Sequence, residues 1–257
     1  MTPGDSLLVL AAGVAAGVIN SVVGSATLLT FPLLLSLGVP PVVANVSNNI
    51  GLVPGALFGA VAYRRELAGQ RSRLLRWGLA AVAGSLLGSV LLLALPSDAF
   101  EAVVPALVLL GVGLVVAGPP VSRWVARRAP EGRVASDGIL PEPRWLSPAV
   151  VGTGVYGGYF GAAQGVMLIA LLGVGYSTDL HRVNAVKNAL AAAINGVAGL
   201  LFALVADVDW WIALLLAVGS GLGGILGGSY GRRLPPTVLR GLVVAVGLAA
   251  FVSILVT

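Results

Sequence analysis

The sequence predicts an all-α integral membrane protein made of two inverted-topology repeats of about five helical segments each. We expect short or broken helices at the centre and eight to ten membrane segments in all. The 257 residues are 58% hydrophobic and only 10% charged, and the mean hydropathy is +1.00. A soluble domain is about half apolar and about a quarter charged. Five apolar segments precede a polar stretch, and five more follow it in the same order of lengths, which indicates an internal repeat.

The first repeat covers residues 1–118 and begins with an apolar segment from Leu7 to Val23. A short apolar run over residues 26–37 follows, and at about 1.5 Å per residue it falls well short of a ~30 Å hydrocarbon core. The third segment runs from Pro41 to Tyr63, and its leading proline suits a first helical turn. Further helices are expected over residues 74–95 and 103–117.

A polar segment rich in proline and arginine, residues 119–146, is expected to link the two repeats. The second repeat covers residues 147–257, and Asp179 offers a cap for its long helix. Both repeats open with the same glycine spacing, at a constant offset: Gly13, Gly17 and Gly24 in the first, and Gly154, Gly158 and Gly165 in the second. The later segments are expected over residues 166–175, 184–207, 210–228 and 238–256.

The charges of the loops predict the orientation. Arginine-rich loops belong on the cytoplasmic side of a membrane, and they occur at residues 64–76, 123–144 and 232–240. The turns at residues 98–101 and 207–209 contain no lysine or arginine and are expected outside. We therefore expect a multi-pass protein of the cell (inner or plasma) membrane, with its N-terminus outside and the linker cytoplasmic. Equivalent loops fall on opposite sides, as in inverted repeats. The short segments are either re-entrant, giving eight spans, or thin spans, giving ten.

Two polar patches stand out in the apolar segments. Asn184, Lys187 and Asn188 have the spacing i, i+3, i+4, and Asn45, Asn48 and Asn49 repeat it in the first half. This spacing places each patch on one face of a helix. Polar side chains in a membrane usually face a bundle interior or a watery cavity. The two patches therefore predict one shared central site.

The types of polar residue favour an anion as the ligand. All ten acidic residues lie in loops, near helix ends or at the N-terminus, so the apolar segments lack the carboxylates that a cation carrier needs. The apolar segments offer amides, hydroxyls, one ammonium and the partly positive N-termini of broken helices. The candidate substrate-binding residues are Asn20, Ser25, Thr27, Asn45, Asn48, Asn49, Gln164, Asn184, Lys187, Asn188 and Asn195.

Simpler roles compete with these assignments. Buried asparagines also serve as hydrogen-bond partners between helices, and Lys187 could extend to the membrane interface. The two Gly-x-x-x-Gly pairs are expected to be helix-packing faces. With no cysteine and one histidine, we expect no metal, cofactor or enzymatic centre. The expected partners are a small anion and membrane lipid, without nucleic acid, and the oligomeric state stays open.

Several segments form a recognisable pattern: residues 17–32, 38–45, 63–67, 161–165 and 183–188. They resemble the TauE/SafE family of sulfite exporters, and the resemblance covers nearly the whole chain. It implies two homologous halves and export of sulfur oxyanions or organosulfonates. The family usually has consecutive glycines at the first break, where this chain has Val23-Gly-Ser-Ala-Thr27.

The expected function is therefore secondary transport, with export of a sulfite-like anion by alternating access at a midplane site. The alternatives are an anion channel and a transporter of a different small anion.

Overall fold

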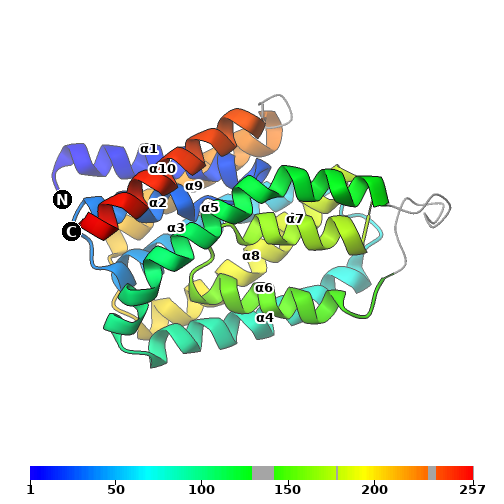
Figure 1. The fold of residues 1–257 in the computed structure, drawn as a ribbon, viewed down its shortest axis with the longest axis horizontal. Helices are drawn as coiled ribbons and strands as arrows, with labels where there is room; N and C mark the ends of the chain where they lie inside the picture. The colour runs from blue at the N-terminus through cyan, green and yellow to red at the C-terminus, as the bar shows by residue number, and fades with distance from the viewer. Residues whose placement is uncertain (129–141, 178, 231–235, 257) are drawn as a thin grey trace.

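The computed structural model describes residues 1–128, 142–177, 179–230 and 236–256, and within these ranges it contains helices and no strands. Residues 129–141 of the predicted linker lie outside the described part. Ten helices form an elongated bundle (Figure 1). They are α1 (Pro3–Val22), α2 (Thr27–Ser36), α3 (Pro41–Ala62), α4 (Arg71–Ala94), α5 (Ser97–Arg128), α6 (Leu146–Tyr159), α7 (Gln164–Gly175), α8 (Leu180–Val205), α9 (Trp210–Tyr230) and α10 (Pro236–Val256).

Most of the predicted helices are confirmed, and the largest error concerns α5. The fifth helix was expected over residues 103–117, but α5 continues to Arg128 and contains Pro105, Pro119 and Pro120. Proline is tolerated inside membrane helices because neighbouring groups can satisfy the freed carbonyls. The first ten residues of the predicted linker are therefore helical. The cap predicted at Asp179 is confirmed, since its side chain accepts a hydrogen bond from the backbone of His181 at 2.9 Å.

The two short helices each belong to a hairpin that starts and ends at the same end of the bundle. In the first hairpin, α2 folds back along α1, so that Leu8 of α1 and Ser36 of α2 line one groove. In the second hairpin, the end of α7 returns to the start of α6, where a Cβ on Gly175 would lie 3.3 Å from the Leu146 side chain. The geometry therefore resembles the re-entrant alternative. Among the residues that the structure describes, five helices are long and apolar enough to cross a membrane: α1, α4, the first part of α5, α8 and α9.

Glycine faces hold together two groups of three parallel helices. In the first helix group (α1, α3 and α9), Gly13 lies against Gly219, and Gly17 lies one turn further along against Gly223. In the second helix group (α4, α6 and α8), Gly154 and Gly158 lie against Ala81 and Ser85 of α4. Small residues let membrane helices approach closely. Both Gly-x-x-x-Gly pairs are therefore helix-packing faces, as predicted.

Each helix group combines helices from both halves of the chain. The first and third helices of one half pack with the fourth helix of the other half, so α9 completes the first group and α4 completes the second. Ser220 of α9 and Ser85 of α4 make matching hydrogen bonds, to the Gly51 carbonyl of α3 at 2.6 Å and the Ile194 carbonyl of α8 at 2.7 Å. Replacing each helix by the one five positions along reproduces the strongest of these helix contacts, including α1·α9 with α4·α6, α3·α9 with α4·α8, and α5·α7 with α10·α2.

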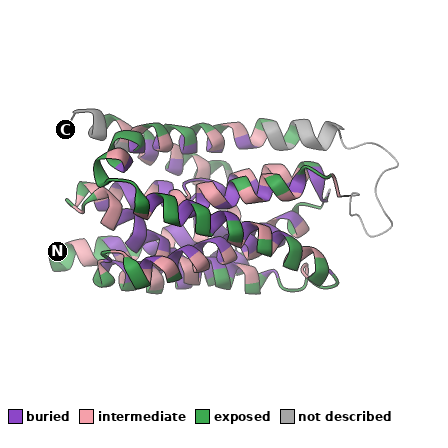
Figure 2. Ribbon diagram, turned by 90° about the horizontal axis from the view of Figure 1, so that it is seen from below, coloured by how far each residue is buried: buried purple, intermediate pink, exposed green. Residues whose placement is uncertain are grey.

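The two helix groups meet along α3 and α8, which run antiparallel. Gly59, near the end of α3, lies beside Asn188, near the start of α8. Gly199, near the end of α8, lies beside Ile50 in the first half of α3. Outside these groups, α10 packs on α2, α5 packs on α7, and α5 and α10 contact each other. Figure 2 shows the buried residues turned toward the interior and the exposed residues turned outward.

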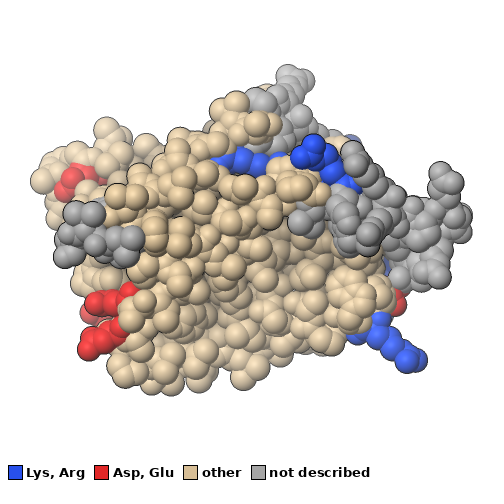
Figure 3. All heavy atoms as spheres, viewed as in Figure 1, with Lys and Arg blue, Asp and Glu red and all other residues tan. Residues whose placement is uncertain are grey.

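Charged side chains gather toward the two ends of the bundle, and the rest of the face shown in Figure 3 is largely uncharged. By the order of the helices, the acidic end carries Asp5, Asp98, Glu101, Asp207 and Asp209. The other end is predominantly basic and carries Arg64, Arg65, Arg71, Arg73, Arg76, Arg144 and Arg182, together with Glu66, Glu142 and Asp179. Between them, large apolar side chains face outward, such as Leu79 of α4 and Leu222 of α9. A surface of this kind and extent marks contact with a membrane.

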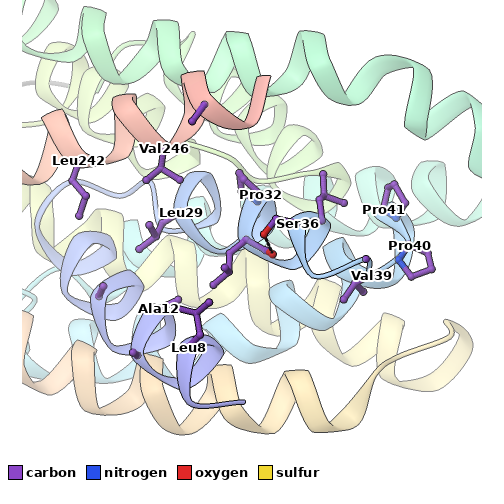
Figure 4. Close-up of a pocket in the computed structure, with 16 residues that line it drawn as sticks. Leu8, Ala12, Leu29, Pro32, Ser36, Val39, Pro40, Pro41, Leu242 and Val246 are labelled. Atoms are coloured by element: carbon purple, nitrogen blue, oxygen red, sulfur yellow. Dashed lines mark hydrogen bonds between the residues drawn. The ribbon is translucent and has the colours of Figure 1, made fainter. Parts of the chain in front are cut away.

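An apolar groove of about 870 Å³ lies between α1, α2, the start of α3 and α10 (Figure 4). Leu8 and Ala12 of α1 form one wall, and Leu242 and Val246 of α10 form another. Leu29, Pro32 and Leu33 of α2 also line it. Thr27 and Thr30 of α2 instead bond to Asn48 of α3. The helix α2 therefore separates an apolar groove from polar side chains.

Glu142, which lies just before α6, connects the start of the second hairpin to α4 by ion pairs. Its two carboxylate oxygens accept hydrogen bonds from Arg73 Nε at 2.6 Å and Arg76 Nη1 at 2.7 Å. Because Arg76 is more than half exposed, we expect Glu142→Gln to lower the free energy of unfolding by only about 1 kcal/mol. Thermal unfolding in detergent would measure this, with Glu101→Gln at an exposed position as the control. Equal stability of both variants would show that the ion pair contributes nothing.

Candidate substrate-binding site

The two hairpin tips meet at the centre of the bundle through their backbones. The Gly165 amide at the start of α7 donates a hydrogen bond to the Gly24 carbonyl at 3.1 Å. Gly24, with φ +87°, turns the chain between α1 and α2, and Gly161, with φ +76°, does the same between α6 and α7. Positive φ favours glycine because a Cβ is strained there. The starts of α2 and α7 therefore lie next to each other.

Neither of these inner helix starts is capped by a side chain. Both have alanine at the N-cap, Ala26 for α2 and Ala163 for α7. By contrast, α1 and α8 begin near the ends of the bundle and are capped by Thr2 and Asp179. Helix N-termini carry partial positive charge and attract anions. The meeting of two such ends makes the centre of the bundle electrostatically suited to an anion.

Lys187 is completely buried and reaches the end of α1. Its Nζ donates to the carbonyl of Asn20 at 2.6 Å and to that of Ser21 at 3.3 Å. The last carbonyls of a helix lack intrahelical partners and form the negative end of its dipole, so the ammonium caps the break between α1 and α2. The alternative in which Lys187 extends to the interface is wrong.

Asn184 and Asn188 complete what we call the basic-end cluster (Asn184, Lys187 and Asn188). The Asn184 amide nitrogen donates to the Ser21 carbonyl at 3.0 Å and to the Tyr63 hydroxyl at 3.3 Å. The Asn184 oxygen and both polar atoms of the Asn188 amide are buried without a hydrogen-bond partner in the described part of the chain. Asn188 lies against Gly59, where an added Cβ would be 3.5 Å from the Asn188 side chain.

The acidic-end cluster (Asn45, Asn48 and Asn49) makes a related set of contacts with the other hairpin. The Asn45 amide donates to the carbonyl of Tyr159, the last residue of α6, at 2.9 Å. Asn45 and Asn184 thus hold equivalent positions, each bonding a carbonyl at the end of the other half's first helix. Asn48 bonds the hydroxyls of Thr27 and Thr30. The Asn49 oxygen is buried and unpaired within the described residues.

A third group of polar residues lies between these clusters. The Gln164 amide nitrogen at the start of α7 donates to the Asn195 oxygen at 2.7 Å. The Gln164 oxygen and the Ser25 hydroxyl have no partner among the residues that the structure describes. Gly157 and Gly161 border the Gln164 oxygen. The centre of the bundle therefore also contains unpaired polar atoms.

Seven of the eleven predicted residues lie along α3 and α8, and the other four, Asn20, Ser25, Thr27 and Gln164, lie at the tips of the two hairpins. Because the two helices are antiparallel, a patch in the first half of each lies toward opposite ends of the bundle. Ile50 of α3 contacts Gly199 of α8, so Asn49 lies at about the same height along the bundle as residue 199. Asn188 is eleven residues before residue 199 in α8. At 1.5 Å per residue, the clusters are separated by roughly 16 Å along the axis.

Some contributors were missed by the sequence prediction. Ser21 and Tyr159 contribute backbone carbonyls, which no side-chain pattern reveals. Thr30 could have been found, since it follows Thr27 by three residues on the same helix face. Asn20 was predicted through its side chain, but the atom that bonds Lys187 is its backbone carbonyl oxygen.

The chemistry of the site is that of amides, hydroxyls and one cation. Ten of the eleven candidates are at most 8% exposed, and Asn184 is half-buried. Among the described residues, the buried polar set contains Lys187 but no aspartate or glutamate. A buried polar atom without a partner costs about 1–3 kcal/mol. Such atoms are usually satisfied by water or a bound group, so this arrangement can hold a polar ligand.

Comparison with known proteins identifies a family and several relatives of the chain. The family described as "Sulfite exporter TauE/SafE" matches residues 9–254. A probable membrane transporter protein from Sinorhizobium sp is 24% identical over 244 residues, covering 93% of this chain and 88% of the relative. A probable membrane transporter protein from Haemophilus influenzae is 26% identical over 236 residues, covering 90% of this chain and 87% of the relative.

A third relative, the probable membrane transporter protein YfcA of Escherichia coli K12, is 27% identical over 213 residues, covering 82% of this chain and 75% of the relative. No solved structure matches the chain. The family match extends over nearly the entire sequence, and the helices are long and apolar enough for a multi-pass membrane protein. The chain therefore belongs to the sulfite exporter TauE/SafE family of membrane transport proteins.

Proposed function

We propose that the protein is a secondary transporter that exports a small anion, a sulfur oxyanion or organosulfonate, by alternating access between inverted repeats. The observation that carries the proposal is the meeting of two uncapped helix starts at Gly24 and Gly165. Buried, unpaired amides and one buried ammonium lie along the same helix pair, and no carboxylate is buried in the described part. The family description supports sulfite or a related compound as the substrate.

The arrangement of the halves supports an alternating-access mechanism. The equivalent helices α3 and α8 run in opposite directions, and the two hairpins enter the bundle from opposite ends. Inverted repeats with broken helices at a midplane site are typical of secondary transporters. By the positive-inside rule, the basic end is cytoplasmic and the N-terminus is outside. Each hairpin would then face one side of the cell membrane.

The burial of the candidate residues favours a transporter over an anion channel. An open pore exposes its lining to water, whereas ten of the eleven candidates are almost completely buried. Flux measured in proteoliposomes should therefore saturate and should be stimulated by unlabelled anion on the opposite side. Linear flux without counterflow would instead indicate a pore.

The test of the anion site is binding to detergent-purified protein. We expect one of sulfite, thiosulfate, sulfate and sulfoacetate to stabilise the wild type, and Lys187→Met to weaken its binding by about tenfold, the loss of roughly one charged hydrogen bond. Arg182→Met removes a partly exposed cation three residues after the Asp179 cap and is the matched control.

Because Lys187 also caps α1, the thermal stability of each variant without anion is measured alongside. If every anion shifts Lys187→Met and the wild type equally, Lys187 only holds the helix break. If no anion binds the wild type, the anion transporter proposal is wrong.

A further inference from the structure

We propose that the basic-end cluster selects a singly charged oxyanion that carries a hydroxyl group, such as hydrogen sulfite, over dianions and over monoanions without a hydroxyl. This inference rests on the proposed function, since it specifies the chemical form of the ligand at the same site. Three features of the cluster carry it: a fixed acceptor on Asn184, an unpaired amide on Asn188, and the single charge of Lys187.

The orientation of the Asn184 amide is fixed by its neighbours. Its nitrogen lies 3.0 Å from the Ser21 carbonyl oxygen, which can only accept a hydrogen bond. Exchanging the oxygen and nitrogen of Asn184 would place two acceptors against each other, so the amide assignment is unambiguous here. The Asn184 oxygen is therefore an acceptor that is buried without a donor among the described residues. It needs a ligand that donates a hydrogen bond.

The Asn188 amide lies one helical turn further along the same face. It is 1% exposed, and neither of its polar atoms has a partner within the described ranges. In either amide orientation, it presents one donor and one acceptor. A group with both an X–O⁻ and an X–OH matches this pair, since the anionic oxygen accepts from the amide N–H and the hydroxyl donates to a carbonyl oxygen. The oxygens of a sulfonate or a dianion can only accept hydrogen bonds. They would therefore leave the Asn184 and Asn188 oxygens without a donor.

The charge of the cluster favours a monoanion. Lys187 is the only charged residue that is buried among the described residues. One ammonium and one negative charge form a neutral pair, whereas a dianion would leave one negative charge uncompensated. An uncompensated charge in a low-dielectric interior is strongly unfavourable. The cluster thus discriminates by charge and by the need for a hydroxyl.

The experiment measures the affinities of purified protein for sulfite, methanesulfonate and sulfate, well below and well above the pKa of hydrogen sulfite, which lies near neutral pH. Methanesulfonate keeps one charge and no hydroxyl at both pH values, so it reports changes in the protein alone. We expect the wild type to bind total sulfite at least about tenfold more tightly at the lower pH, the effect of one satisfied buried hydrogen bond. At the lower pH, methanesulfonate and sulfate should each bind at least about tenfold more weakly than sulfite.

The variant Asn184→Leu should reduce the preference for sulfite over methanesulfonate toward unity at the lower pH. Ser89→Ala is the control, because it removes a buried interhelical hydrogen bond, from the Ser89 hydroxyl to the Gly158 carbonyl, outside the candidate residues and should leave the preference unchanged. If Asn184→Leu does not fold, the wild-type comparison still decides the inference.

The outcomes separate the two proposals. Binding of sulfite and methanesulfonate with equal affinity at both pH values would overturn the selection of a hydroxyl-bearing monoanion and leave the anion transporter standing. Binding of none of the three anions at either pH would overturn both.

Discussion

Replacing Gly24 with alanine is expected to destabilise the protein by about 3 kcal/mol and to abolish anion binding. The added Cβ would lie 2.6 Å from the Gly165 Cα, and backbone at the junction cannot move aside as a flexible side chain can. Overpacking of this kind typically costs 1–3 kcal/mol, and φ at +87° adds about 1 kcal/mol of strain. Thermal unfolding in detergent and anion binding would measure the two effects.

Gly38→Ala is the matched control for this substitution. Gly38 also has a positive φ, +80°, but a Cβ there has no neighbour within 4 Å. The two variants share the backbone strain and differ in the contact between the hairpin tips. The difference in their free energies of unfolding therefore isolates that contact. Equal destabilisation by both variants would mean that the tips of the two hairpins do not touch in the folded protein.

A second large effect is expected from Gly154→Ala, which should destabilise the protein by about 3 kcal/mol because it separates α6 from α4. The new Cβ would lie 2.5 Å from the Ala81 carbonyl oxygen and 3.1 Å from the Ser85 amide nitrogen. Both atoms belong to helix backbone, so relief requires movement of the whole helix. The free energy of unfolding, measured with denaturant in mixed micelles, is the relevant quantity.

Gly152→Ala, two residues earlier in α6, is its control. A Cβ on Gly152 meets nothing within 4 Å, and alanine is the better helix former by about 0.5–1 kcal/mol. We expect this variant to be as stable as the wild type or slightly more stable. Similar losses from both substitutions would contradict the close packing of α4 and α6.

The sequence was sufficient to predict the helices because apolar length and glycine position are local signals. The short segment predicted over residues 26–37 is α2, and the helix expected from Pro41 to Tyr63 ends one residue earlier, at Ala62. The end of α5 was not predictable in the same way. Pro119 and Pro120 normally end a helix in water, and whether they do so depends on neighbours that compensate for the lost hydrogen bonds.

The burial of the candidate residues could be predicted from the sequence, but their placement relative to one another could not. The equal spacing of the two asparagine patches correctly indicated burial, since Asn48 and Asn188 are almost completely buried. Their separation could not be predicted from spacing, because it follows from the antiparallel packing of α3 on α8. The cap that Lys187 forms on α1 depends on backbone carbonyls far away in the sequence. Such contacts are set by tertiary structure alone.

The exchange of fourth helices between the two groups has a consequence for how the protein is made. The glycine face of α1 is covered by α9, which leaves the ribosome only after both α4 and the second hairpin. Until α9 is present, the surfaces of α1 and α3 that pack against it contact lipid or another protein. Neither half of the chain can thus complete its helix group alone, and the first half reaches its final arrangement only after α9 has been synthesised.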